Sequence, residues 1–209
     1  MSDTKFLIIY DTYCGWCYGA APVFDALVAS GANVEVLHRH LFQGPLAVRM
    51  ADGKGAHVLK ADARIGELTG QEFSKKYTEN VVLSDTEILE SGYTAQAAAL
   101  VHDQGPEKEF AIRNRLETAR YIDGVSASNR EAVVSALIAE GIPEEDAQKI
   151  GTPELAEKAK ELSEKAEAAM MTVGAYGVPT VIKVEGDKFT QVDHSAFYGQ
   201  PEKIRELAA

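Results

Sequence analysis

The sequence predicts an α/β fold in which a long, mainly helical segment interrupts a strand–helix–strand unit and its closing hairpin. The apolar run Phe6–Tyr10 is typical of a short buried strand, and it leads through two cysteines into a helical pattern. Residues 44–150 carry helical periodicities and turns but no convincing strand. A Gly-Val-Pro segment then opens a hairpin, Val178–Val184 with Phe189–Val192, which completes an expected sheet.

Residues that kink or end a helix mark the boundaries of the strand–helix–strand unit. A helix is expected from Ala20 to Ala29, with a kink at Pro22 because proline lacks the N–H of the helical ladder. Gly31 favours the left-handed geometry that ends helices. Asn33–Phe42 then predicts a second strand with His38 and His40 on one face. Such a unit should be parallel and right-handed.

The interrupting segment, residues 44–150, is predicted to be an all-helical insertion domain, and residues 1–43 and 151–209 form the domain that it interrupts. Asn129 suits an N-cap, and Ser84 to Glu87 fits a capping box. The expected helices are Ala56–Thr69, Gln71–Tyr77, Ser91–Asp103, Pro106–Ile122 and Asn129–Glu140.

The closing part begins with Thr152-Pro153, a cap residue followed by proline at the first helical position. The helix that starts there should continue to about Val173. After the hairpin, Gln200-Pro201 opens a last helix that is expected to reach Leu207.

The only two cysteines of the chain, Cys14 and Cys17, are spaced as Cys-x-x-Cys where the first strand meets the first helix. The first turn of a helix leaves backbone N–H groups unpaired and carries about half a positive charge. A sulfur placed there ionises more readily than a free thiol, whose pKa is about 8.5. Because residues three apart share a helix face, the sulfurs can meet. The pattern predicts a redox site in which Cys14 attacks and Cys17 resolves the mixed disulfide.

The residues around the cysteines tune this site. Gly15 and Trp16 carry no cation, so stabilisation of a thiolate must come from the helix and its surroundings. Tyr13, Trp16 and Tyr18 are expected either to line the surface around the sulfurs, where they favour apolar peptide segments, or to cover the core.

A cysteine pair can also bind zinc or be an inert part of the core. Structural zinc needs four ligands, and the sequence offers neither a second cysteine pair nor histidines at zinc-finger spacing. No metal is therefore expected. Two inert core cysteines remain the bland alternative.

Composition narrows the class of partner. The formal net charge of -11 argues against nucleic acids and anionic membrane surfaces. No apolar run approaches the ~20 residues of a membrane span. The first strand begins near Lys5, which leaves no room for a signal peptide, so a cytoplasmic location is expected and a disulfide there would be transient.

The order of elements and a set of motif residues resemble the DsbA-like family of thiol:disulfide oxidoreductases, including its FrnE-like members. The motif residues are Asp11, Cys14-Gly15-Trp16-Cys17-Tyr18, Gly177-Val178-Pro179-Thr180 and Tyr198-Gly199-Gln200-Pro201-Glu202. The resemblance implies a thioredoxin-like fold with a helical insertion. It also implies Cys14 as nucleophile, Cys17 as resolving thiol, and Val178-Pro179 as a cis-proline pair whose backbone meets an extended substrate.

The sequence departs from the family at two points. The pair between the cysteines is Gly-Trp rather than Pro-His, so we expect a less oxidising couple than in dedicated disulfide-introducing enzymes. Periplasmic members place an acid six positions before the first cysteine, where this chain has Ile8. Asp11 is either a substitute acid or a residue that shapes the turn.

The leading hypothesis is a protein-disulfide oxidoreductase that exchanges disulfides with protein or small-molecule thiols, glutathione being one candidate, without a cofactor. A second reading is a glutathione-dependent transferase or isomerase, since the scaffold also resembles kappa-class glutathione transferases. A third is a protein-binding module switched by its disulfide.

Overall fold

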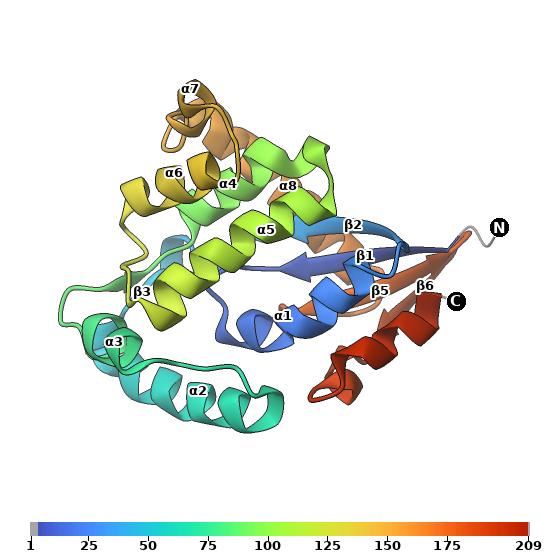
Figure 1. Cartoon of the computed structure of the whole chain (residues 1–209), viewed down its shortest axis with the longest axis horizontal. Helices are drawn as coiled ribbons and strands as arrows, with labels where there is room; N and C mark the ends of the chain where they lie inside the picture. Colours follow the sequence, from blue (N-terminus) through green and yellow to red (C-terminus); the bar gives the residue numbers. More distant parts are fainter. Residues whose placement is uncertain (1–3, 209) are drawn as a thin grey trace.

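A computed structural model describes residues 4–208. Its centre is a four-stranded sheet in the order β2-β1-β5-β6, in which β1 pairs parallel with β2 and antiparallel with β5 (Figure 1). Ile8 lies opposite Val36 on one side and Val181 on the other. The predicted α/β class is confirmed. The strands are β1 Thr4–Tyr10, β2 Asn33–His38, β5 Thr180–Glu185 and β6 Lys188–Val192.

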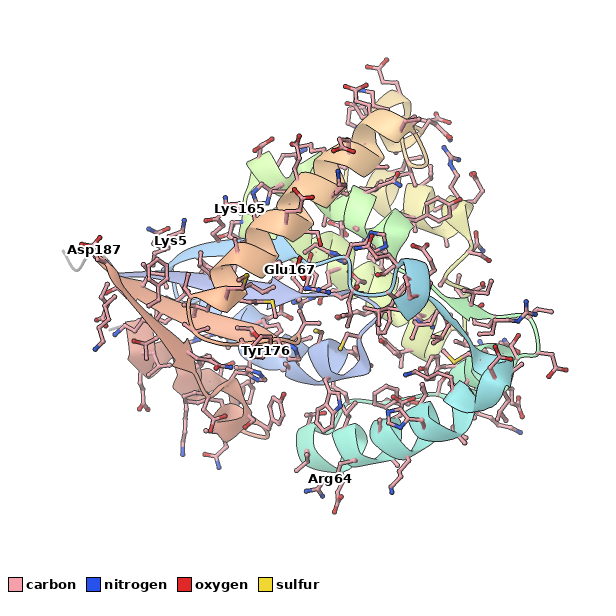
Figure 2. The ribbon with its side chains drawn as sticks, turned by 180° about the vertical axis from the view of Figure 1, so that it is seen from behind. Lys5, Arg64, Lys165, Glu167, Tyr176 and Asp187 are labelled. Atoms are coloured by element: carbon pink, nitrogen blue, oxygen red, sulfur yellow. The ribbon has the colours of Figure 1, made fainter. Side chains whose placement is uncertain are left out.

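Helices cover both faces of this sheet. Helix α1, Gly15–Val28, and the 3-10 helix η7, Pro201–Ala208, share one hydrophobic cluster with the inward side chains of β1. Helix α8, Pro153–Met171, packs against the opposite face. Figure 2 shows α8 in front of the sheet, where Glu167 and Lys165 reach toward the β2 side. Glu167 accepts a hydrogen bond from Arg39 at 2.6 Å, and Lys165 pairs with Glu35.

The segment between β2 and α8 covers the sheet in two groups. Helix α2 lies against α1, and α4, α5 and α6 build a second hydrophobic core with the first half of α8. That core includes Leu155 and Ala159 of α8, so the first half of α8 packs against these helices and its second half packs against the sheet. The larger helices of the segment are α2 Gly55–Thr69, α4 Gly92–Val101, α5 Pro106–Glu117 and α6 Arg130–Ala139. The short elements are η1 Gly44–Leu46, β3 Val48–Arg49, η2 Met50–Lys54, α3 Lys75–Tyr77, η3 Thr78–Val82, β4 Ile88–Leu89, η4 His102–Gln104, η5 Thr118–Ile122 and α7 Glu144–Ala147.

Several local signals are confirmed. Asn129 accepts a hydrogen bond from Ala132 N at 3.0 Å, and Thr152 caps α8 with proline at its first position. Gly31 has φ +78°, as expected for a helix stop. Helix α1 runs through Pro22 as one element. The Tyr18 carbonyl, which Pro22 cannot satisfy, accepts a hydrogen bond from the Gln71 side chain at 2.8 Å.

The predicted second strand is too long, since β2 ends at His38. Beyond it, backbone N–H groups donate to side chains instead of to a neighbouring strand: His40 N donates to Ser163 Oγ and Leu41 N donates to Asp11 Oδ2. His40 therefore leaves the sheet and contacts Glu90 at 3.0 Å. The predicted shared face of His38 and His40 is wrong for this reason.

The segment 44–150 is not purely helical, because β3 and β4 pair as a two-residue ribbon. Each of these strands is too short to leave a periodicity in the sequence. Ser84 Oγ accepts from Glu87 N, as in a capping box, but the chain continues into β4 instead of a helix. The helix expected over Gln71–Tyr77 forms only from Lys75, and the last helix is 3-10 rather than α.

Candidate active site

The two cysteines lie at the start of α1, as the sequence predicts. Cys14 is the N-cap residue, with φ -83° and ψ 116°, and its carbonyl accepts from Cys17 N at 2.9 Å and Tyr18 N at 3.0 Å. Both cysteines are free thiols. Cys14 is 7% exposed and Cys17 is 1% exposed. The Cys14 sulfur is therefore the more accessible of the two, and Cys17 is shielded from solvent.

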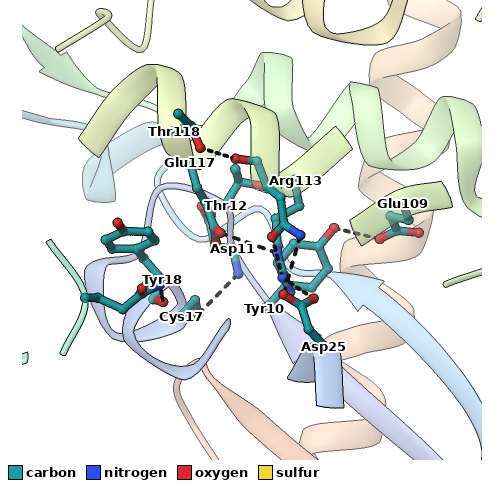
Figure 3. A network of polar contacts seen from close by, with 12 residues as sticks. Tyr10, Asp11, Thr12, Cys17, Tyr18, Asp25, Glu109, Arg113, Glu117 and Thr118 are labelled. Carbon is teal, nitrogen blue, oxygen red and sulfur yellow. Dashed lines mark hydrogen bonds and ion pairs between the residues drawn. The ribbon is translucent and has the colours of Figure 1, made fainter. Parts of the chain in front are cut away.

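Different backbone groups hold the two sulfurs. Asp11 N donates to Cys17 Sγ at 3.5 Å, a contact visible in Figure 3. Cys14 Sγ lies 3.8 Å from the Val178 carbonyl oxygen, to which it can donate. Burial raises the pKa of the Cys17 thiol well above its ordinary value, and the neighbouring Cys14 acts in the same direction. Cys17 is therefore kept protonated in the dithiol form.

The Val178–Pro179 peptide bond, which faces Cys14 through the Val178 carbonyl, is cis. Pro179 is supported from below by His194, whose Nε2 lies 3.3 Å from the Pro179 carbonyl oxygen. His194 in turn packs against Phe24 of α1. An open hollow beside this point is lined by Trp16, Leu68, Val178, Pro179, His194, Ser195 and Tyr198.

Asp11 is fully buried, and both of its carboxylate oxygens are engaged. Oδ1 accepts from Tyr13 N at 2.8 Å, and Oδ2 accepts from Leu41 N at 2.9 Å and from the Ser91 hydroxyl at 2.6 Å. Of the two expectations for Asp11, this geometry favours the turn-shaping one. The carboxylate ties the loop before Cys14 to the end of β2 and to the start of α4.

His38 anchors the same loop from below. Its Nε2 accepts a hydrogen bond from Thr12 N at 3.2 Å, so the ring must be neutral at that nitrogen. Burial lowers the pKa of His38 to about 4. The imidazole is a buried core group and an edge-on neighbour of the Tyr10 ring, and its Nδ1 has no hydrogen-bond partner among the described residues.

Cys14 lies in the wall of a narrow cavity of about 130 Å³ between the start of α1 and helix α2. Most of the wall is apolar, and its polar members come from four separate elements. Trp16 is 38% exposed at the rim, whereas Tyr13 is buried in the wall. The lining residues are Tyr13, Cys14, Gly15, Trp16, Phe42, Met50, Lys54, His57, Val58, Ala61, Asp62, Ile65, Tyr77, Leu89 and Arg120.

Sequence reasoning did not find the buried ion pair of this cavity. Arg120 of η5 donates to Glu87 at 3.0 Å, and its guanidinium lies 4.6 Å from the centre of the Tyr13 ring. Glu87 also accepts from Ser126 Oγ and from Ala127 N, each at hydrogen-bond distance. No motif marks residues this far apart as neighbours. The pair fixes Tyr13, which was predicted as a site residue.

A second buried network lies behind α1 (Figure 3). Arg113 of α5 donates to Asp25 of α1 at 2.7 Å and lies 3.5 Å from Glu117. Burial raises the pKa of Glu117 to about 8. On the same helix, Glu109 accepts a hydrogen bond from the Tyr10 hydroxyl at 2.8 Å. These contacts join α5 to α1 and β1 and so position the cysteine-bearing helix.

Neither a metal nor a membrane segment is evident across residues 4–208. No group of three or more His, Cys, Asp or Glu side chains there is arranged to hold a metal ion. Of the helices in the described part of the chain, none combines the length and the apolar character needed to cross a bilayer.

With a dithiol at a helix start, a thioredoxin-like sheet and a helical segment between its halves, the chain has the architecture of a disulfide oxidoreductase. The model of the DSBA-like thioredoxin domain family matches residues 7–198. The chain belongs to this family, and its fold and its class as a protein-disulfide oxidoreductase, both predicted from the sequence, are confirmed.

Solved structures show which members of this family the chain is similar to. The chain is 25% identical to the cytosolic disulfide reductase DsbM from Pseudomonas aeruginosa, with a TM-score of 0.83 and coverage of 97% of this chain and 96% of that one. The same protein with GSH matches with a TM-score of 0.78 at the same identity and coverage. A candidate protein disulfide isomerase from Nitrosomonas europaea is 18% identical and shares the fold, with a TM-score of 0.77. The match covers 98% of this chain and 95% of that one. A comparison with curated proteins found no match.

Proposed function

We propose that the chain exchanges disulfides through its Cys-Gly-Trp-Cys dithiol. In this proposal Cys14 is the nucleophile, Cys17 resolves the mixed disulfide, and Pro179 holds the Val178 carbonyl toward the substrate. The observation that carries it is the placement of the Cys14 sulfur at the helix start, 3.8 Å from that carbonyl and open to a cavity. Trp16 and Tyr13 line the substrate side, Gly15 leaves room for the cavity wall, and Asp11 shapes the loop.

The physiological direction that we propose is reduction in the cytoplasm. The Gly-Trp pair places no cation between the cysteines to stabilise a thiolate and so make the disulfide a strong oxidant. The similar DsbM structure is that of a cytosolic disulfide reductase, which supports both the direction and the compartment. A cytoplasmic dithiol also meets a pool that returns it to the reduced form.

The substrate class that we propose is a disulfide of a small peptide thiol such as glutathione. The cavity at Cys14 is narrow and Cys14 is only 7% exposed, so a compact folded protein could not enter it. Lys54 and His57 line the cavity at its more exposed side and suit the carboxylates of such a peptide. The similar DsbM structure with GSH supports this choice.

The test is turnover by defined cysteine variants. Pre-reduced wild-type protein should convert one equivalent of glutathione disulfide to two of glutathione while Cys14 and Cys17 become a disulfide, and neither Cys14→Ser nor Cys17→Ser should complete this reaction. Cys17→Ala should accumulate a glutathione adduct on Cys14, detected by intact-protein mass spectrometry. Full turnover by both serine variants would refute the dithiol mechanism, and conjugation of an electrophile by Cys17→Ala would favour the transferase reading.

The direction is tested separately by equilibrating the Cys14/Cys17 couple with glutathione redox buffers. We expect a reduction potential nearer to thioredoxin, about -270 mV, than to DsbA, about -120 mV. A potential at the DsbA end would reverse the proposed direction without affecting the dithiol chemistry.

A further inference from the structure

Asp62 is a buried acid in the wall of the Cys14 cavity with no assigned role. It lies on α2, is 6% exposed, and its Oδ2 has no hydrogen-bond partner among the described residues. Its other oxygen is close to the cysteine motif, because a Cβ built on Gly15 would lie only 3.1 Å from Asp62 Oδ1. The carboxyl thus adjoins the residue that follows Cys14.

Burying a carboxyl without a full set of hydrogen bonds costs free energy, so this position needs an explanation. Arg120, the cation whose charge acts on Asp62, is already paired with Glu87. Burial raises the pKa of Asp62 to about 7, although the Tyr77 hydroxyl and the Arg120 charge act in the opposite direction. Near neutral pH the carboxyl can therefore hold a proton and also release it.

The surroundings of Asp62 come from several elements. Tyr77 of α3 and Arg120 of η5 face it from one side, and Cys14 lies at the start of α1. Lys54 and His57 line the same cavity where η2 meets α2. A substrate sulfur bound at Cys14 would occupy the space that these groups enclose.

We propose that Asp62 is the proton donor for the leaving sulfur of a disulfide that Cys14 attacks. The inference rests on the proposed function. The Cys14 thiolate forms a bond to one substrate sulfur, and the substrate S–S bond breaks with its electron pair on the other sulfur. That thiolate takes the proton of the Asp62 carboxyl and departs as a thiol. The Asp62 carboxylate recovers a proton from water before the next turnover, so no further reactant is needed.

The physical advantage lies in the leaving group. An aliphatic thiolate is a poor leaving group because its conjugate thiol is a weak acid, whereas an aromatic thiolate leaves without help. A positioned general acid typically contributes about 100-fold or more to such a step. A proton held in the cavity wall beside Cys14 is available where the leaving thiolate forms.

The experiment compares two disulfides in single-turnover reactions with the pre-reduced full chain. Asp62→Asn, which keeps the shape of the neutral acid, should slow reduction of glutathione disulfide about tenfold or more. The same variant should react almost unchanged with the aromatic disulfide DTNB and with iodoacetamide, since neither leaving group needs a proton. Glu67→Gln, an exposed acid on the same helix, is the matched control and should alter none of these rates.

The pH dependence of the wild-type protein gives a second measurement that needs no variant. The rate with glutathione disulfide relative to DTNB should fall as the pH rises through about 7, where Asp62 loses its proton. Equal slowing of all three reagents in Asp62→Asn, an unchanged rate with glutathione disulfide, or a pH-independent ratio would overturn the proposal. If Asp62→Asn shows none of the expected effects but Cys14 remains essential for reduction, this inference fails and the proposed function stands.

Discussion

The loop that carries Cys14 depends on a neutral imidazole, and acid should weaken it. His38 is 2% exposed, accepts a hydrogen bond from Thr12 N, and burial lowers its pKa to about 4. Replacing it with glutamine, His38→Gln, supplies an amide oxygen where Nε2 lies and removes the titration. We expect mild acid to lower the stability of the wild-type protein and to leave the stability of this variant unchanged.

Whether acid raises or lowers the stability depends on which state, folded or unfolded, binds more protons. The unfolded chain protonates His38 near pH 6.5, whereas the folded chain resists protonation down to about pH 4. Between these values the unfolded state binds more protons, so stability is fully present above pH 6.5 and falls as the pH is lowered toward 4. A pKa lowered from 6.5 to about 4 corresponds to about 3 kcal/mol, of which about 2 kcal/mol is lost between pH 7 and pH 5.

The assay is urea unfolding followed by circular dichroism at pH 7 and pH 5 for wild type, His38→Gln and the exposed control His57→Gln. Buried acids such as Asp62 and Glu117, whose pKa values are raised, push stability the other way, but they do so equally in all three proteins. The quantity of interest is therefore the difference between variants. If His38→Gln loses as much stability as wild type between the two pH values, the neutral imidazole is not what supports the loop.

Three sets of substitutions test packing, charge and capping by urea unfolding. A Cβ at Gly19 would lie 2.5 Å from Ile65 Cγ2, so Gly19→Ala should destabilise by about 1–3 kcal/mol, and a gain in stability would show that α1 and α2 separate freely. Arg120→Met leaves the buried Glu87 carboxylate without its ion-pair partner and should lower the free energy of unfolding by about 3–5 kcal/mol. The double variant Arg120→Met with Glu87→Leu should recover much of that loss. Equal losses of stability in the single and double variants would contradict this. Asn129→Ala should cost about 1 kcal/mol and Asn129→Asp little, because aspartate also caps; similar losses would mean that the cap is unimportant.

The sequence predicted the parts of the site that depend on neighbours along the chain. The Cys14 and Cys17 spacing, the helix stop at Gly31 and the caps at Asn129 and Thr152 are all local signals, and each is found where it was expected. Their physics is contained within a few residues. That is why periodicity and cap chemistry suffice to place them.

The rest of the site arises from tertiary contacts that leave no local trace. Asp62 looks like any acid of an amphipathic helix, and only the approach of α2 to Gly15 buries it. Arg120 and Glu87 lie 33 residues apart, and no spacing rule links them. The end of β2 was missed for the same reason, because the groups that draw the backbone away at Leu41 and His40 are the distant side chains of Asp11 and Ser163.

The contact between the Cys14 sulfur and the Val178 carbonyl joins residues 164 positions apart. At about 5–20 residues per second, a ribosome needs roughly 8–33 s to make the intervening chain. During that interval the nascent polypeptide carries both thiols without the strand that later shields them. Under the proposed reductive function, the thiol pool that keeps these sulfurs reduced during synthesis would also be the pool that recycles the dithiol.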